Sequence, residues 1–382
     1  MKFQKKILSN GITILHENRD VPVVSFSISN PFAASHENSE IKGVAHLIEH
    51  LVFTGTKTRT NEEISKEIEK RGGVLNAFTS HDVTSFWFKL PSEHLFTGAD
   101  IIVDILKNSV FEKEKFEKEK KVVMEEIKMR HDNPQIDIFR KLEENLYEKP
   151  FGEGIIGSEK TISALKRDFV FDYFKKNYSP ENYIIAVVGK SDFSKVCSYI
   201  EKQFQAHKKI LAPVPVKKKT SESTEEREGI DQAHFAIGFH APSADNKKHQ
   251  VLEVLDAYLA SGMSSKLYLE IREKRGLAYA VLSSINTEKY YSYYSIYVGT
   301  KKESIPEVKS LILEGFKKIS EMTEENLSDS KERLIGLREI SSEESLNVMN
   351  NLIFTHLSTD NADDYYKYKE KINVVTLREV KD

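Results

Sequence analysis

The chain has 382 residues, which is long enough for two or three domains with hydrophobic cores of their own. Its 56 lysines and arginines nearly balance its 59 aspartates and glutamates, and the formal charge of −3 argues against a nucleic-acid-binding surface. The single cysteine, Cys197, excludes an intramolecular disulfide framework and a multi-cysteine metal site, so any metal would be bound by histidine and carboxylate side chains.

The first residues predict a β-hairpin and no targeting segment. Asn10-Gly11 lies between the apolar stretches 7–8 and 12–15, and this dipeptide favours the left-handed backbone angles of a tight turn. The apolar stretch before it is shorter than the roughly 7–15 residues of a secretory signal. No apolar run approaches the roughly 18 residues of a membrane-spanning helix. We therefore expect a soluble, cytoplasmic protein that does not enter a membrane.

Strands and helices alternate along the first half of the chain. The apolar segment 43–53 predicts a helix, and 61–70 predicts a second helix that ends before Gly72, where glycine can serve as a C-cap. Aromatic and β-branched residues favour strands in several short segments, and helices are expected from about 93 to 148. The predicted strands cover residues 23–29, 74–79, 84–90 and 183–189.

The composition changes at 213–228, where prolines, a lysine run and a Ser/Thr/Glu tract offer little to bury. We predict a linker there, between a domain at 1–212 and a domain at 229–382. The tetrapeptide at 69–72, Glu-Lys-Arg-Gly, recurs at 273–276, each time after a helix and before paired strands and two long helices. The predicted fold class is α+β, with two related domains that are each an antiparallel sheet flanked by helices.

The helix at 43–53 contains the sequence His46-Leu-Ile-Glu49-His50. Two histidines four residues apart project from one face of a helix, so both rings can reach one metal ion, and Glu49 borders the same face. Zinc binds imidazole nitrogen and carboxylate oxygen in tetrahedral geometry, and a catalytic site keeps one position for water. The pattern therefore predicts a zinc site that needs a third protein ligand.

The order H-x-x-E-H reverses the H-E-x-x-H motif, and the chain resembles the pitrilysin, or insulysin-type, metallopeptidases that carry it. The resemblance implies a third zinc ligand on a second helix, at Glu126, and a supporting carboxylate seven residues earlier, at Glu119. Glu125 is the competing ligand if the register is shifted by one residue. The dense charge of this segment is also typical of an ordinary solvated helix face.

Two further segments resemble parts of the family that bind substrate. Asn76, Ala77 and Phe78 lie in a segment similar to the edge strand beside the metal, to which a substrate backbone can add as another strand. In the second domain, Arg272 and Tyr279 resemble the arginine and tyrosine that reach substrate from the noncatalytic half. Without the resemblance, the segment 76–78 would be interpreted as part of an ordinary interior hairpin, Arg272 as a solvated side chain and Tyr279 as a packed one.

The second domain has no metal motif of its own. The stretch 251–262, which matches the first domain's helix, contains no histidine. The chain also stops at Asp382, where the resemblance implies a further helix and strand, so the second domain is expected to lack them.

The predicted function is that of a zinc-dependent endopeptidase that hydrolyses peptides or unfolded protein segments. Zinc on His46, His50 and Glu126 would lower the pKa of a bound water towards about 7, and Glu49 would act as the base. The resemblance implies a homodimer, or a heterodimer with a related chain, that encloses the substrate. The alternatives are a noncatalytic scaffold or partner subunit of the same fold and, more remotely, a metal-dependent hydrolase of small molecules.

Overall fold

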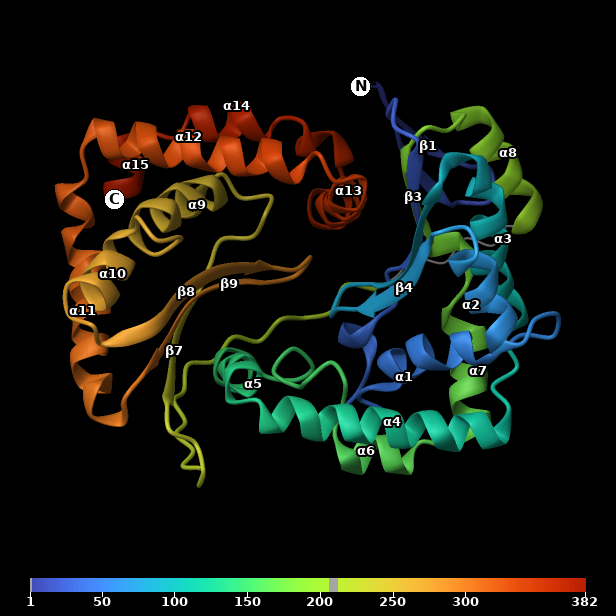
Figure 1. The fold of residues 1–382 in the computed structure, drawn as a ribbon, viewed down its shortest axis with the longest axis horizontal. Coiled ribbons are helices and arrows are strands. Elements are labelled where there is room, and N and C mark those ends of the chain that lie inside the picture. The colour runs from blue at the N-terminus through green and yellow to red at the C-terminus, as the bar shows by residue number, and fades with distance from the viewer. Residues whose placement is uncertain (1, 206–211) are drawn as a thin grey trace. The chain divides into compact units, whose positions relative to one another are not determined.

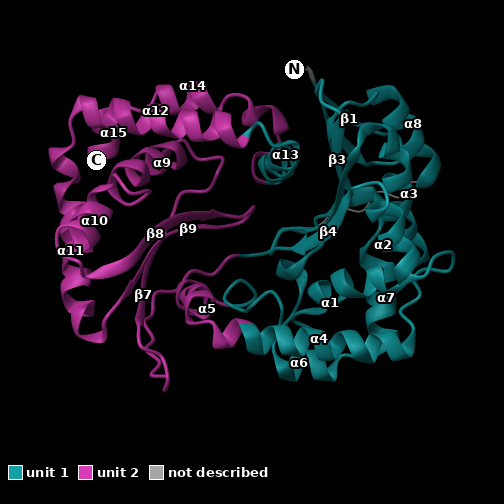
Figure 2. Cartoon of the chain, viewed as in Figure 1, with its two compact units in different colours: residues 1–129, 149–215, 342–357 teal, residues 130–148, 216–341, 358–382 magenta. Residues whose placement is uncertain are grey.

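The computed structural model describes residues 2–205 and 212–382, and the chain forms two compact units (Figures 1 and 2). Unit 1 comprises residues 1–129, 149–215 and 342–357, and unit 2 comprises residues 130–148, 216–341 and 358–382. Each unit combines a β-sheet with several helices, so the predicted α+β class is confirmed. No helix of the described residues is long and apolar enough to span a lipid bilayer.

Unit 1 contains a six-stranded sheet in the order β1-β2-β6-β3-β5-β4. Its strands are β1 (Lys2–Ile7), β2 (Thr13–Asn18), β3 (Val23–Asn30), β4 (Val74–Thr79), β5 (Thr84–Pro91) and β6 (Ile184–Gly189). The hairpin predicted at Asn10-Gly11 joins β1 to β2, and Gly11 has the positive φ of 87° that the turn requires. The sheet is not wholly antiparallel as expected, because β6 returns after a long helical connection and pairs in parallel with β2.

Helices cover both faces of this sheet. The helices of unit 1 are α1 (Val44–Leu51), α2 (Asn61–Glu69), α3 (Leu95–Asn108), most of α4 (Lys113–Asp132), α6 (Glu159–Ala164), α7 (Arg167–Asn177), α8 (Phe193–Gln203) and most of α13 (Ser345–Thr359). One face is apolar: side chains such as Phe26, Phe86 and Phe88 are buried there against α1, α2, α3, α7 and α8. The other face carries the buried serines Ser25 and Ser27.

Unit 2 contains a three-stranded antiparallel sheet in the order β7-β9-β8. Its elements are α5 (Pro134–Leu146), β7 (Ala233–His240), α9 (Lys248–Leu259), α10 (Lys266–Tyr268), a π-helix (Leu269–Glu273), β8 (Ala278–Thr287), β9 (Ser292–Thr300), α11 (Ile305–Lys317), α12 (Glu324–Ser341), α14 (Tyr368–Asn373) and α15 (Leu377–Lys381). Both copies of the repeated tetrapeptide end in a left-handed glycine before a strand, at Gly72 (φ 72°) and Gly276 (φ 61°). The two copies of the tetrapeptide thus share a left-handed turn as well as a sequence.

The bounds of the two compact units do not coincide with those of the predicted contiguous domains, 1–212 and 229–382. Helix α5 joins unit 2 because the Phe139 ring lies 5.7 Å from that of Tyr297 and the Tyr147 hydroxyl donates to the Ser292 carbonyl at 2.9 Å. Helix α13 joins unit 1. The predicted linker at 213–228 contains no regular helix or strand, and the end of the first predicted domain, 206–211, lies outside the described residues.

Candidate metal centre

The helix α1 is held at its N-terminus by a buried carboxylate. Glu37 accepts hydrogen bonds from the backbone N–H groups of Gly43, at 3.0 Å, and Ala45, at 2.7 Å, and the Lys42 ammonium lies 3.8 Å away. A carboxylate satisfies the free N–H groups of a helix start and is favoured by the helix dipole. Gly43 has a φ of 96°, and a Cβ there would lie 2.5 Å from the Ile156 carbonyl oxygen, so glycine is required.

Sequence reasoning did not single out Glu37. The only signal was an acidic residue shortly before a glycine that precedes the helix, which resembles many loop sequences. Burial raises the pKa of the Glu37 carboxyl to about 7, against the opposing effects of Lys42 and the two backbone hydrogen bonds. Its position shows that it fixes where α1 starts.

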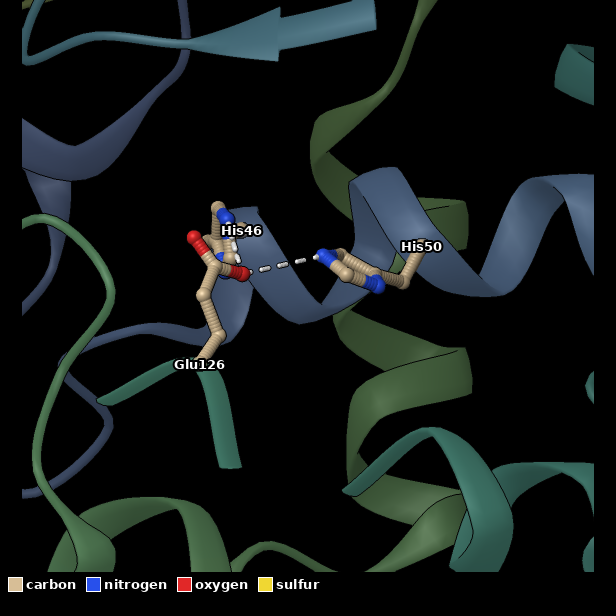
Figure 3. Close-up of side chains that lie close together, drawn as sticks. All are labelled: His46, His50 and Glu126. Carbon is tan, nitrogen blue, oxygen red and sulfur yellow. Dashed lines mark ion pairs between the residues drawn. The ribbon is translucent and has the colours of Figure 1, made fainter. Parts of the chain in front are cut away.

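The structure brings together the three predicted metal-binding side chains, His46, His50 and Glu126 (Figure 3). The Oε2 atom of Glu126 lies 3.5 Å from Nε2 of His46 and 3.6 Å from Nε2 of His50. Two ligands at about 2.1 Å from a tetrahedral zinc are about 3.4 Å apart, so these separations need little adjustment to bind one ion. The donor set of two imidazoles and one carboxylate fits zinc.

Helix α4 presents Glu126 and Glu119 to this cluster and turns Glu125 away from it. The buried side chains Phe116 and Val123 fix the inner face of α4. Consequently the Glu126 side chain is only 19% exposed, whereas that of Glu125 is 73% exposed and pairs with Lys128 on the same helix. The charged run of α4 is therefore not a uniformly solvated face, and of the two adjacent glutamates only Glu126 reaches the histidines.

His50 is held between two carboxylates of α4. Its Nδ1 atom lies 3.4 Å from Oε2 of Glu119, while its Nε2 atom faces Glu126. Burial alone would lower the pKa of His50, but the bonds with Glu119 and Glu126 and the charge of Glu49 raise it to about 9. A carboxylate on the far nitrogen also orients a metal-binding imidazole and makes it a better ligand.

Glu49 lies on the same helix but is held by a different element. The Thr79 hydroxyl, at the end of β4, donates a hydrogen bond of 2.6 Å to Oε2 of Glu49. This contact fixes the carboxylate beside the cluster without making it one of the three clustered donors. Thr79 was not predicted as a site residue, although it adjoins the predicted segment 76–78.

The three predicted substrate-contact residues of β4 do not share a face. Phe78 and Asn76 lie opposite Ser85 and Trp87 of β5, so they point to the face of the sheet that carries the buried serines. Ala77 points to the other face and packs against the apolar core. Only Ala77 therefore shares the face of Thr79, whose hydroxyl contacts Glu49.

Arg272 and Tyr279 lie together in unit 2. Arg272 is in the π-helix Leu269–Glu273, and its guanidinium lies 5.0 Å from the ring centroid of Tyr268 and 5.5 Å from that of Tyr279. Tyr279 is 77% exposed. Within the described residues, neither the Arg272 guanidinium nor the Tyr279 hydroxyl makes a hydrogen bond or ion pair. Both polar groups are thus available to a ligand.

A second group of possible ligand atoms, in unit 2, is an ion-pair network. His131, Asp137 and Glu225 approach one another, but the Arg227 guanidinium lies between the carboxylates, 2.5 Å from Asp137 and 2.8 Å from Glu225. Lys141 also pairs with Glu225. These cations already neutralise the carboxylates, so the arrangement does not favour a metal ion.

Comparison with family models gives two matches that together span most of the chain. Residues 15–159 match a family described as "Insulinase (Peptidase family M16)", and residues 164–334 match one described as "Peptidase M16 inactive domain". A protein from Rickettsia felis named "Uncharacterized zinc protease" is 31% identical to this chain, over 86% of this chain and 81% of that protein. One in Bacillus subtilis is also 31% identical, over 87% and 83%.

Solved structures share the fold at lower identity. A protease from Helicobacter pylori superposes with a TM-score of 0.91 at 22% identity, over 100% of this chain and 95% of that chain. A putative M16-like peptidase from Alicyclobacillus acidocaldarius gives 0.82 at 17% identity, over 100% and 94%. At these identities the likeness establishes the fold alone.

Proposed function

Because the chain belongs to peptidase family M16, the insulinase family, we propose that it is a zinc-dependent endopeptidase that hydrolyses peptides or unfolded protein segments. The observation that carries the proposal is the convergence of His46, His50 and Glu126, with Glu49 beside them. The donor types and the two separations between Glu126 and the histidines support the proposal.

Each side chain of the site has a role in this proposal. Bound zinc would polarise the scissile carbonyl and make water more acidic. Glu49 accepts the proton of the attacking water and returns it to the leaving amine, and Thr79 holds its Oε2 atom in place. Glu119 orients His50 through Nδ1.

The substrate class is proposed from the position of β4. This strand is at the edge of its sheet, and its last residue, Thr79, contacts Glu49. An extended peptide that paired with β4 would therefore run past the proposed base. A hydrolase of small molecules would not need an open strand edge beside its base, so we consider it the weaker alternative.

The test combines metal analysis with peptide cleavage. Purified protein is assayed for zinc content and for cleavage of a mixed library of unstructured peptides, before and after removal of metal by a chelator and re-addition of zinc. We expect about one zinc per chain and cleavage that follows the metal. The matched control is Glu49→Gln, which should bind zinc and not cleave.

The same experiment addresses the alternative of a noncatalytic scaffold or partner subunit. A chain that binds zinc but cleaves no peptide, alone or mixed with a related chain, would support a noncatalytic role. We also propose that the active form is a homodimer or a heterodimer with a related chain, which light scattering of the purified protein would test. Cleavage by a stable monomer would refute the dimer.

A further inference from the structure

The Glu37 carboxylate joins α1 to the segment that precedes this helix. Each of its two oxygens accepts one backbone N–H at the start of α1, Oε2 from Gly43 and Oε1 from Ala45. The residue is only 3% exposed, so solvent competes little for these bonds. Directly before it along the chain lies a short 3-10 helix, Ala34–His36. The carboxylate therefore fixes the start of α1 to this short helix.

The short helix is itself bonded to the loop that follows β4. The Ser35 N–H donates to the His81 carbonyl at 2.9 Å, and the Ala34 N–H donates to the Ser80 carbonyl at 3.4 Å. Ala34, Ser35 and His81 are buried. Residues 34–37 therefore form a bridge between the start of α1 and the end of β4.

The two elements that this bridge joins both hold Glu49. Helix α1 carries the residue, and Thr79, the last residue of β4, donates the hydrogen bond of 2.6 Å to its Oε2 atom. Thr79 is followed at once by Ser80, whose carbonyl accepts a hydrogen bond from the bridge. The position of the Glu49 carboxylate relative to Thr79 thus depends on how α1 is held against the end of β4.

We propose that Glu37 is a positioning residue of the peptidase reaction, which holds Glu49 in place by fixing α1 to the end of β4. The inference rests on the proposed function, in which Glu49 takes the proton of the attacking water. Proton transfer requires the base to lie within hydrogen-bond reach of that water, and a misplacement of about 1 Å can lower a rate about 100-fold. Glu37 acts through α1 and need not touch the substrate.

Two substitutions of Glu37 disturb its contacts in different ways. Glu37→Gln replaces one acceptor oxygen by an NH2 group, which would face a backbone N–H of α1. It also removes the charge that lies 3.8 Å from the buried Lys42 ammonium. Glu37→Asp keeps this charge and both oxygens on a shorter side chain. If Glu37→Gln does not fold, Glu37→Asp takes its place in every measurement.

The kinetic test compares Glu37→Gln with Thr79→Val, which removes the hydroxyl that holds Glu49. We expect each substitution to lower kcat on unstructured peptides about tenfold and to leave KM within about twofold. The double variant should be no more than about threefold slower than either single variant, because both substitutions release the same carboxylate. Independent effects would multiply to about 100-fold.

The matched control is Glu63→Gln, which makes the same chemical change at the start of another helix of unit 1. The Glu63 carboxylate accepts the Thr60 N–H at 2.8 Å in the cap of α2. This variant should keep the kcat of the wild type within about twofold, because the cap of α2 has no bond to the bridge. Zinc content and thermal melting of each variant show whether it is folded.

Amide hydrogen exchange of the metal-free protein gives a readout that depends on neither cleavage nor zinc. In Glu37→Gln, exchange should become about tenfold faster in residues 43–51 and also in residues 76–83, because the bridge connects them. Loss of a helix cap alone would change 43–51 and leave 76–83 as in the wild type. Glu63→Gln should change neither segment.

The outcomes separate this inference from the proposed function. If the wild type cleaves peptides and the effects of Glu37→Gln and Thr79→Val multiply, the positioning role is wrong and the peptidase stands. If no peptide is cleaved but exchange rises in both segments, Glu37 still positions Glu49 and the peptidase is wrong. An exchange effect confined to 43–51 overturns the positioning role whether or not peptides are cleaved.

Discussion

Replacing Glu126 with glutamine removes the negative charge at the point where the two imidazoles converge. Its Oε2 atom is within 3.6 Å of Nε2 on both His46 and His50, and the side chain is only 19% exposed. At an effective dielectric constant of about 20, two unit charges about 4 Å apart attract by about 4 kcal/mol. With allowance for the remaining solvent, we expect zinc binding to weaken by about 3 kcal/mol, or about 100-fold.

Glu125→Gln is the matched control, because it makes the same chemical change one residue away on the same helix. Its side chain is 73% exposed and pairs with Lys128, so the zinc dissociation constant should change less than about threefold. Glu119→Gln should fall between the two, with an effect of about 10-fold, because Glu119 acts through His50.

The assay is a competition for zinc between each variant and a chromophoric chelator at one fixed pH. The pH must be fixed because zinc and a proton compete for His50. Equal effects of Glu125→Gln and Glu126→Gln, or a larger effect of Glu125→Gln, would refute the assignment of Glu126 as the third ligand.

Other predictions concern the base, the second unit and the pH dependence of stability. Glu49→Gln should keep its zinc and lose about 10²–10⁴-fold in peptide turnover. Zinc content and turnover are measured on the same sample, and full activity would exclude Glu49 as the base. Tyr279→Phe should lower kcat on peptides and Arg272→Ala should mainly raise KM, so that kcat/KM falls in each variant by the equivalent of about 2–4 kcal/mol. Unchanged steady-state kinetics in both would remove them from the site. Burial raises the pKa of Glu253 to about 7, despite the opposing charge of Arg338. The contribution of this carboxyl group to the free energy of unfolding is therefore fully present below about pH 4.5 and is lost as the pH rises through 7. Glu253→Gln should therefore gain stability over the wild type between pH 5 and 8, by up to about 3 kcal/mol in urea unfolding, and parallel pH curves would contradict this.

Local patterns predicted the elements that carry the site. The apolar spacing around His46 and His50 gave the helix, and the aromatic and β-branched runs gave β4 and β5 with bounds that differ by at most one residue. These features depend on neighbours along the chain. The register of α4 was harder, because Glu125 and Glu126 look alike in sequence, and only the burial of Phe116 and Val123 decides which one faces inward.

What the sequence could not give depends on contacts between distant segments. Nothing in the composition of α13 indicates that it covers β3, β5 and β4, since Ser345 and Phe354 meet Ser25 and Phe78 only after the chain has passed through unit 2. Glu37 was missed for the same reason. Its role appears only when its carboxylate meets the N-terminus of α1.

Buried acidic groups have different partners in the two units, and this difference determines the expected metal content. The stretch 251–262, which overlaps α9 and matches α1 in the repeat, contains no histidine, and its carboxylates accept hydrogen bonds from phenols. The Tyr294 hydroxyl donates to Asp256 at 2.8 Å and the Tyr368 hydroxyl to Glu253 at 3.4 Å. Within residues 2–205 and 212–382, two imidazoles and a carboxylate converge only between α1 and α4, and this is a donor set that zinc prefers. We therefore expect one tight zinc site per chain in a titration monitored by calorimetry, lost in a His46→Ala, His50→Ala double variant. A second site of comparable affinity that survives this change would refute the assignment of metal binding to unit 1.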